Sequence, residues 1–166
     1  MKATPAQSFI QAILVATDFS DRSMKAETFA FSMAERFGAT LVFVHGIEPI
    51  LGTDDGDEND DFEEFYERLR VKAREQLRER VERARLQGLQ ARFHVEVGPR
   101  WGIILERAEV EDADMIVIGR RSYTEGGPIS LGTTSQRVYF GSHRPVFIVP
   151  LEHGSTEGED SPGGQA

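Results

Sequence analysis

The chain of 166 residues contains no cysteine, and this absence excludes several classes of function at once. Without thiols there is no disulfide framework, no thiolate zinc site and no cysteine nucleophile. No apolar run is long enough to cross a bilayer, and residues 1–9 lack the charged and apolar blocks of a signal peptide. We therefore expect a cytoplasmic protein that does not insert into a membrane.

Several catalytic and metal-binding signatures are also missing. The 4 histidines have no paired spacing that suits a metal, and neither a Gly-x-x-x-x-Gly-Lys-Ser/Thr loop nor a Gly-x-Ser-x-Gly elbow is present. No residue stands out as a general base. The sequence therefore identifies no catalytic residue and no resident metal, and magnesium is expected only together with a nucleotide.

The net charge of −9 is unevenly distributed along the chain. Residues 54–64 contain eight acidic side chains and no basic one, and residues 151–166 contain four acidic side chains and no basic one. The remainder has 16 acidic residues against 19 Lys and Arg, a balance of about +3. This distribution favours solubility and argues against nonspecific nucleic-acid binding, but it is compatible with a locally basic phosphate site.

Apolar runs alternate with segments of helical periodicity, which predicts one α/β domain over residues 1–150. The alternation implies right-handed crossovers and a parallel sheet covered on both sides, that is, a doubly wound fold. Strands are predicted at 12–17, 40–45, 91–97, 114–119 and 146–149. Helices are predicted at 21–37, 62–87, from Pro99 onward and at 134–140.

The ends of these elements and the segments between them carry further expectations. Ser20 is expected to cap the first helix, and Gly38 to stop it. The apolar face of the 62–87 helix is expected to pack inward, while its arginine-rich face, with Glu64 and Arg68 four residues apart, indicates a solvated surface. Residues 52–61 are predicted to be a mobile acidic loop and residues 151–166 a disordered acidic tail.

Two strands are expected at the edges of the sheet. The 91–97 segment has one wetter face, as edge strands often do. Val146–Val149 lies between two prolines, which an edge strand tolerates. Its free backbone groups are suited to pairing with a second copy of the chain.

The segment from Met115 to Pro150 contains the candidate site. A buried strand ends at Gly119, a loop with further glycines follows, and a helix opens near Gly132. This order places flexible backbone and helix amide groups at the carboxyl edge of a parallel sheet, where α/β proteins hold anions. The sequence therefore predicts an anion site in this segment.

Four segments together resemble the universal stress protein family over about Phe9 to Pro150. They are "ILVATDFSDRS", "LVFVHGIEP", "VEVGPRWGIILERAEVEDADMIVIG" and the closing helix and strand. The resemblance implies a Rossmann-like sheet of five strands in the order 3-2-1-4-5, of the type seen in adenine nucleotide alpha hydrolases. It also implies a homodimer paired through Val146–Val149 and, in many members, bound ATP.

The nucleotide-binding members of this family carry a pattern of Gly, two residues, Gly, nine residues, Gly and then Ser or Thr. Here these positions are Gly119, Ser122, Gly132 and Thr133, so a serine replaces the second glycine and reduces the room for a phosphate. The resemblance implies a cofactor-binding set made up of Ala16, Thr17, Asp18, Gly46, Ile118, Gly119, Arg120, Ser122, Gly132, Thr133, Thr134 and Ser135.

Two of these positions carry expectations of their own. Asp18 matches the aspartate that lies near the adenine and ribose in relatives that bind ATP. Gly46 stands where many members have a valine that packs on adenine, so we expect weaker base selectivity here.

Structural interpretations of the same residues remain open. Asp18 and Ser20 also fit a helix-capping turn, and Thr133 with Gln136 has the spacing of a capping box. Arg120 can offset phosphate charge or simply be solvated.

Three hypotheses of function follow in order of preference. The first is a dimeric regulatory module that binds ATP or another adenine nucleotide, with or without Mg²⁺. The second is an interaction protein without nucleotide that contacts a partner, such as the cytoplasmic face of a transporter. The third is a slow ATPase.

Overall fold

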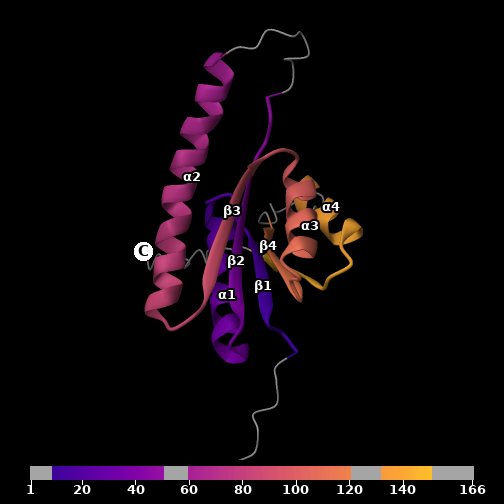
Figure 1. Ribbon diagram of the computed structural model, residues 1–166. Helices are drawn as coiled ribbons and strands as arrows, with labels where there is room; N and C mark the ends of the chain where they lie inside the picture. The colour runs from indigo at the N-terminus through magenta and orange to yellow at the C-terminus, as the bar shows by residue number, and fades with distance from the viewer. Residues whose placement is uncertain (1–8, 51–59, 121–131, 151–166) are drawn as a thin grey trace, which may run out of the picture.

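The computed structural model describes residues 9–50, 60–120 and 132–150. Five parallel strands form one sheet in the order β3-β2-β1-β4-β5, with helices on both faces (Figure 1). The predicted fold class and strand order are therefore confirmed. The elements are β1 (Ala12–Ala16), α1 (Asp21–Phe37), β2 (Thr40–Ile47), α2 (Asp60–Leu86), β3 (Ala91–Val97), α3 (Arg100–Val110), β4 (Met115–Arg120), α4 (Thr133–Gly141) and β5 (Val146–Pro150).

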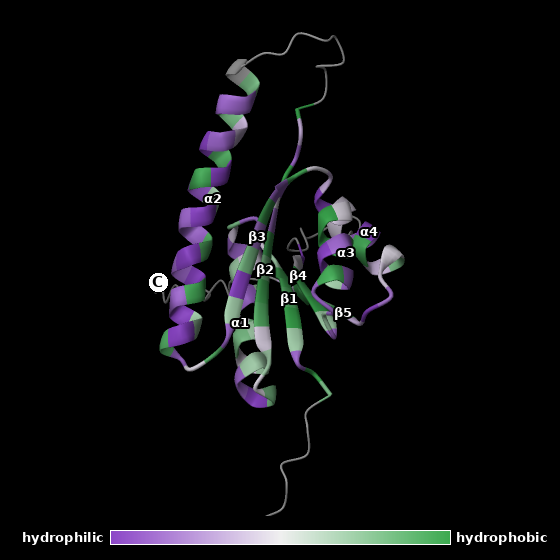
Figure 2. Ribbon diagram, viewed as in Figure 1, coloured by the Kyte–Doolittle hydropathy of each residue, from purple (hydrophilic) through white to green (hydrophobic). Residues whose placement is uncertain are grey.

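The three central strands β2, β1 and β4 are largely hydrophobic (Figure 2). They are buried on both faces because their side chains alternate between two hydrophobic layers. On β1, Ile13 and Val15 pack in the layer covered by α1 and α2, while Leu14 and Ala16 pack in the layer that contains residues of α3 and α4. β2 and β4 follow the same alternation. Their near-continuous apolar composition is what a parallel sheet covered on both faces requires.

Both edge predictions are confirmed by the strand order, which places β3 at one edge and β5 at the other. Residues along β3 are only partly buried or exposed, in contrast to the fully buried β1. β5 extends one residue beyond its predicted end, because Pro150 pairs with Arg120 of β4. The backbone of β5 therefore has a strand neighbour on one side within the described part of the chain.

The helix boundaries correct several sequence expectations. α2 begins at Asp60, two residues inside the predicted acidic loop. The rest of that loop and the predicted tail at 151–166 lie outside the described residues. Of the structural alternatives left open, the capping box of Thr133 and Gln136 does not form, since Gly132 occupies the N-cap position of α4 and no side chain caps this helix. Pro99 is the N-cap residue of α3 rather than its first helical residue.

The ends of α1 agree with the sequence prediction. The side chain of Ser20 accepts a hydrogen bond from the amide of Ser23, and Gly38 ends the helix in the left-handed conformation with φ 66°. Glycine adopts this conformation without the steric cost that a β-carbon would add. Both ends of α1 are therefore determined by local sequence.

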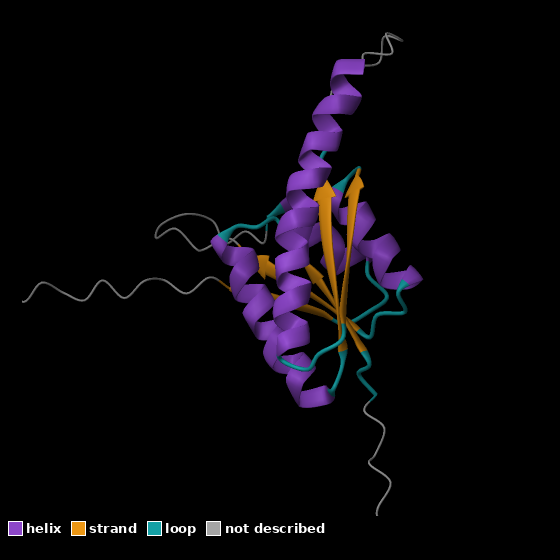
Figure 3. Cartoon of the chain, turned by 60° about the vertical axis from the view of Figure 1, so that its left-hand side comes forward, coloured by secondary structure: helices purple, strands orange, loops and turns teal. Residues whose placement is uncertain are grey.

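The long helix α2 packs on the sheet with its carboxyl-terminal half and extends beyond it with its amino-terminal half (Figure 3). Ala73, Leu77, Val81 and Ala84 are buried. Phe65, in the extending half, is only partly buried. The outer face carries paired charges such as Arg68 Nη1 to Glu64 Oε1 at 2.7 Å, which confirms the solvated face. Within residues 9–50, 60–120 and 132–150, no helix combines the length and apolar character that membrane crossing requires.

A buried ion pair joins α1 to α2. The carboxylate of Glu27 is 5% exposed and accepts from Arg80 Nε at 2.8 Å and from Thr17 Oγ1 at 2.6 Å. Arg80 also donates to the carbonyl oxygen of Gln76 and lies over the ring of Phe19, 5.0 Å from its centroid. Because each charged group has several partners, the pair ties the two helices and β1 together without leaving an uncompensated charge.

Replacing Arg80 tests this pair. Arg80→Met is expected to lower the free energy of unfolding by about 3–5 kcal/mol, because Glu27 would then be buried without its cation. Urea denaturation followed by circular dichroism measures the loss. The matched control Arg68→Met removes an arginine from an exposed pair and is expected to change stability by less than about 1 kcal/mol. Equal losses in the two variants would contradict the assignment.

Candidate functional site

The candidate site lies at the carboxyl edge of the sheet, between β1 and β4, where the strand order reverses. Open α/β sheets bind ligands at such a switch point because the following loops diverge there. Thr17 and Asp18 follow β1, Gly46 lies near the end of β2, and Gly119 and Arg120 end β4. Ala16 and Ile118 are buried in the α3 and α4 layer beneath this edge. The fold thus brings together predicted residues from three strands.

Ser122, the serine at the second glycine position of the nucleotide-binding pattern, lies outside the described residues. Arg120 is partly buried. The remaining predicted residues, at 132–135, open α4. They lie next to the end of β4, because Ser135 contacts the carbonyl oxygen of Gly119.

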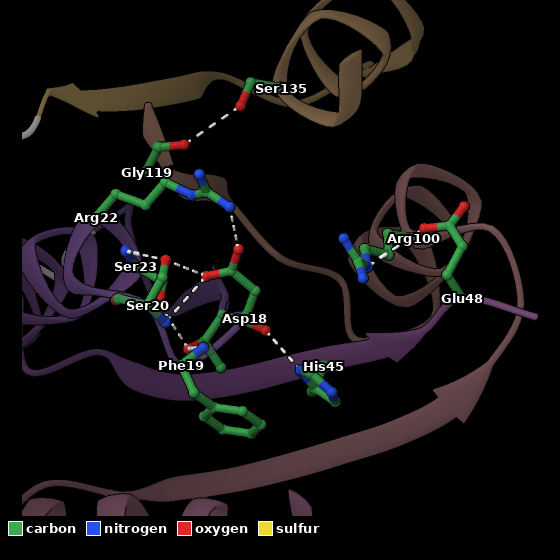
Figure 4. A network of polar contacts seen from close by, with 11 residues as sticks. Asp18, Phe19, Ser20, Arg22, Ser23, His45, Glu48, Arg100, Gly119 and Ser135 are labelled. Carbon is green, nitrogen blue, oxygen red and sulfur yellow. Dashed lines mark hydrogen bonds and ion pairs between the residues drawn. The ribbon is translucent and has the colours of Figure 1, made fainter. Parts of the chain in front are cut away.

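Asp18 is held in a compact polar turn (Figure 4). One carboxylate oxygen accepts from the amide of Ser20 at 3.1 Å and from its hydroxyl, and the other accepts from Arg22 Nη2 at 2.6 Å. Burial alone would raise the pKa of Asp18, but the hydrogen bonds from Ser20 and Arg22 outweigh it and hold the pKa well below its usual value. Asp18 is therefore a carboxylate at neutral pH, available to accept further hydrogen bonds through its remaining lone pairs.

Thr17 faces the other side of the sheet from Asp18. Its hydroxyl donates to Glu27 Oε1 at 2.6 Å and accepts from the amide of Phe19 at 3.1 Å. The side chain is therefore committed to the layer of α1 and α2. Thr17 can contribute to a ligand at this edge only through its backbone.

Gly119 is required by the approach of α1. A β-carbon built on Gly119 would lie 2.4 Å from the carbonyl oxygen of Arg22 and 3.1 Å from the amide nitrogen of Ser23. No real β-carbon tolerates a backbone atom so close. The glycine that matches the nucleotide motif is thus needed for helix packing whether or not a phosphate binds.

The start of α4 presents backbone rather than side-chain donors. Gly132 has φ 80° and ψ 149°, a conformation that favours glycine. Thr133 is exposed and Thr134 is partly buried. Ser135 is buried and donates to the carbonyl oxygen of Gly119 at 3.3 Å, which joins α4 to the end of β4. Because the cap residue is a glycine, no side-chain oxygen competes with an anion for the first-turn amides.

His45 forms the floor of the turn on the β2 side. Its Nδ1 lies 2.9 Å from the carbonyl oxygen of Thr17, which fixes Nδ1 as the protonated nitrogen because a carbonyl only accepts. The ring stacks on Phe19 at 4.4 Å between centroids. Burial lowers the pKa of His45 below its ordinary value, so the imidazole is neutral at pH 7.

Phe19 has a backbone conformation that is uncommon for its residue type. Its φ is 64°, in the left-handed region that bulky residues rarely occupy. The stacking of its ring on His45 and the guanidinium of Arg80 above it accompany this conformation.

Gly46 shows which residue the sequence interpretation missed. A β-carbon built on Gly46 would lie 3.1 Å from the Cα of Arg100 and 3.2 Å from the Cδ1 of Ile103. The space above Gly46 is therefore occupied by the first turns of α3. Arg100 also pairs through Nε with Glu48 Oε2 at 3.3 Å (Figure 4). The glycine at 46 together with a helix opening after Gly98-Pro99 was the signal that could have identified Arg100.

A metal site in a protein needs several ligand side chains that converge on one point. Among residues 9–50, 60–120 and 132–150, no group of three or more His, Asp or Glu side chains is arranged to hold a metal ion. Asp18 contributes one carboxylate to the edge between β1 and β4, and this carboxylate is bonded to Ser20 and Arg22. The expectation that magnesium comes only with a nucleotide stays a prediction.

A family model and a curated relative both match this chain to the universal stress protein family. The model of the Universal stress protein family matches residues 10–150. The "Universal stress protein in QAH/OAS sulfhydrylase 3′region" of Thermus aquaticus is 34% identical over 149 residues, which span 82% of this chain and 96% of the relative.

Solved structures share the fold. The universal stress protein UspA of Lactobacillus plantarum has a TM-score of 0.72 at 19% identity, over 84% of this chain and 97% of that one. A universal stress protein in complex with cAMP has a TM-score of 0.59 at 23% identity, over 84% and 96%. One from Archaeoglobus fulgidus in complex with dAMP has a TM-score of 0.57 at 23% identity, over 86% and 98%.

The packing role of Gly119 can be measured directly. Gly119→Ala is expected to lower the free energy of unfolding by at least about 1–3 kcal/mol, because the added methyl group meets the backbone of α1. Gly102→Ala is the matched control, since the nearest atom to a β-carbon there lies 4.0 Å away. Because Gly102 lies within α3, this change is expected to raise the free energy of unfolding by up to about 0.5–1 kcal/mol. Thermal unfolding of both variants checks the prediction, and a neutral Gly119→Ala would refute it.

Proposed function

Because the chain belongs to the universal stress protein family, we propose that it is a regulatory module that binds an adenine nucleotide at the carboxyl edge of β2, β1 and β4. The observation that carries this proposal is the convergence of Asp18, the end of β4 and the glycine-capped start of α4 at the switch point of the sheet. Family members of the same fold that are complexes with cAMP and with dAMP support an adenine ligand.

The geometry suggests an order for the parts of the nucleotide along the edge. The amides at the start of α4 and the guanidinium of Arg120 suit the phosphates, because both provide positive charge beside β4. Asp18 suits the ribose, since its carboxylate accepts hydrogen bonds from hydroxyl groups. The base then lies toward the carboxyl end of β2, beside the first turn of α3. ATP, with Mg²⁺ carried on its phosphates, is the form we propose.

The ion pair between Asp18 and Arg22 does not close this site. Their side chains are 29% and 32% exposed, so the pair is partly solvated. A partly solvated pair contributes modest stability, and its cation can turn toward a phosphate when a ligand brings new acceptors. In this account Asp18 keeps its hydrogen bonds from Ser20 and accepts the ribose hydroxyls on the side that Arg22 vacates.

Nucleotide binding is tested with purified protein and a matched pair of aspartate variants. The wild type is expected to release adenine nucleotide on denaturation, or to gain about 2.7 kcal/mol of stability at a hundredfold excess of Mg-ATP over its dissociation constant. Asp18→Asn is expected to weaken binding about tenfold, the cost of one charged hydrogen bond. Mass spectrometry and isothermal titration calorimetry provide the two measurements.

The control for Asp18 is Asp114→Asn. Asp114 accepts hydrogen bonds from the amides of Gln11 and Ala12 at the start of β1, at the opposite edge of the sheet. This variant is expected to bind ATP as the wild type does. A wild type that carries no nucleotide and shows no melting shift would remove the proposal.

We also propose that two copies of the chain associate through β5. The strand lies at the sheet edge, and Phe147 on it is 40% exposed while its ring packs 5.9 Å from that of Phe29. A second β5 would satisfy the outward backbone groups and cover this ring. Regulation by a nucleotide would then be transmitted through the shape of a dimer.

Oligomeric state is measured by light scattering after gel filtration. Phe147→Glu is expected to convert the dimer to a monomer, because two carboxylates would face each other across the symmetric interface. Leu86→Glu, which replaces an 81% exposed residue at the end of α2, is the control and is expected to leave the dimer intact. A monomeric wild type would end this part of the proposal.

A second candidate function, contact with a protein partner without nucleotide, is favoured by one observation. In the extending half of α2, Phe65 and Leu69 lie four residues apart on one face of the helix, and both are only partly buried. Such a half-covered apolar stripe suits the binding of another protein. The absence of any nucleotide effect in the experiments above would turn the interpretation toward this function.

A further inference from the structure

A pair of charged side chains lies where the proposed function places the base. Arg100 and Glu48 are 45% and 53% exposed, and the 3.3 Å between Nε and Oε2 makes a long contact. Exposed pairs of this kind contribute little to stability. Each side chain can therefore exchange its partner for a ligand at small cost.

Gly46 is the reason that Arg100 lies at this edge. The Cα and Cγ of Arg100 would be 3.1 and 3.2 Å from a β-carbon on Gly46. The first turn of α3 approaches β2 so closely that a side chain at residue 46 would require it to shift by a few tenths of an ångström. The strand register pairs Ala16 with Val44, and Nδ1 of His45 lies 2.9 Å from the carbonyl oxygen of Thr17, so the residues that precede Gly46 and Asp18 are in contact. Arg100 thus stands over the strand position next to the proposed ribose carboxylate.

The close view supports this placement. In Figure 4, Arg100 lies between Asp18 and Glu48, with its guanidinium on the side of Asp18. The base end of the proposed site is therefore lined by the guanidinium of Arg100 and the carboxylate of Glu48.

The two groups have a defined hydrogen-bonding character. A guanidinium has five N–H donors in a planar fork and no acceptor, whereas a carboxylate only accepts. Guanine presents two adjacent acceptors, N7 and O6, which an arginine contacts in a bidentate manner. Adenine presents N7 beside the N6 amino donor, so a guanidinium can satisfy only one of the two. Glu48 can accept from the N–H groups that guanine carries on its other edge.

We infer that Arg100 and Glu48 form a base-recognition subsite for 6-oxopurines, so that the protein binds guanine nucleotides at least as tightly as adenine nucleotides. This inference depends on the proposed function, because it requires a purine nucleotide at this edge of the sheet. It extends that function by naming the residues that select the base.

The test compares the dissociation constants of Mg-GTP and Mg-ATP by isothermal titration calorimetry on the full chain. The wild type is expected to bind GTP with equal or higher affinity. In Arg100→Met the affinity for GTP is expected to fall at least about fivefold more than the affinity for ATP, because the bidentate contact is lost. Glu48→Gln is expected to shift the ratio in the same direction.

A matched arginine provides the control. Arg92 on β3 pairs with Glu111 through Nε at 2.5 Å and is 48% exposed, similar to Arg100, but it does not line the proposed site. Arg92→Met is expected to leave both nucleotide affinities unchanged. Should Arg100→Met unfold early in a thermal melt, Arg100→Lys replaces it, because an ammonium keeps the charge but cannot make the bidentate contact.

The outcomes separate the two proposals. A wild type that binds ATP but binds GTP at least fivefold more weakly would overturn the inference and leave the proposed function in place. An equal loss of both affinities in Arg100→Met would also overturn it, since Arg100 would then contact the phosphates. A folded wild type that binds neither nucleotide would refute the proposed function itself.

Discussion

The contact between the first turn of α1 and the bare backbone of Gly119 is the constraint on which the rest of this edge depends. The carbonyl group of Arg22 occupies the position that any side chain at 119 would need. Through this approach α1 crosses from β1 onto β4 and joins the two halves of the sheet on one face. The turn from Asp18 to Ser20 is fixed between β1 and that helix, so its carboxylate faces the switch point.

A polar layer lies under the same edge and separates it from the apolar core. Thr17, Glu27 and Arg80 are joined by hydrogen bonds at 2.6 and 2.8 Å, and His45 is bonded to the backbone of Thr17. Because the groups are satisfied within the protein, they hold the ends of β1 and β2 in place without requiring a ligand. The edge above them is therefore held in place by the fold itself.

The sequence predicted those features that depend on local chemistry or on a repeating pattern. Ser20 and Gly38 bound α1 as expected, and the buried strands followed from their apolar runs. It failed where the partner is remote in the chain. The ion pair of Glu27 and Arg80 joins residues 53 positions apart in the chain. Residue spacing along a helix predicts which side chains share a face, but it does not predict which other element packs against that face.

The capping box at the start of α4 failed for a related reason. Thr133 and Gln136 have suitable side chains, but the conformation of Gly132 already sets the helix start. The backbone conformation of Gly132 determines the cap residue, and the spacing of side chains in the sequence does not predict that conformation.

Gly46 and Gly119 have a packing role that their match to a sequence motif does not reveal. Each lacks a side chain where a helix of the same chain comes close, α3 at 46 and α1 at 119. Packing therefore accounts for both glycines before any ligand is considered, and their match to a nucleotide-binding pattern is weaker evidence than it first appears in sequence. What remains informative about a ligand is what the close helices carry to the edge. At 119 that is Arg22, which pairs with Asp18 of the turn before α1, and at 46 it is Arg100. The chemistry of this edge therefore follows from the approach of the helices and not from the glycines themselves.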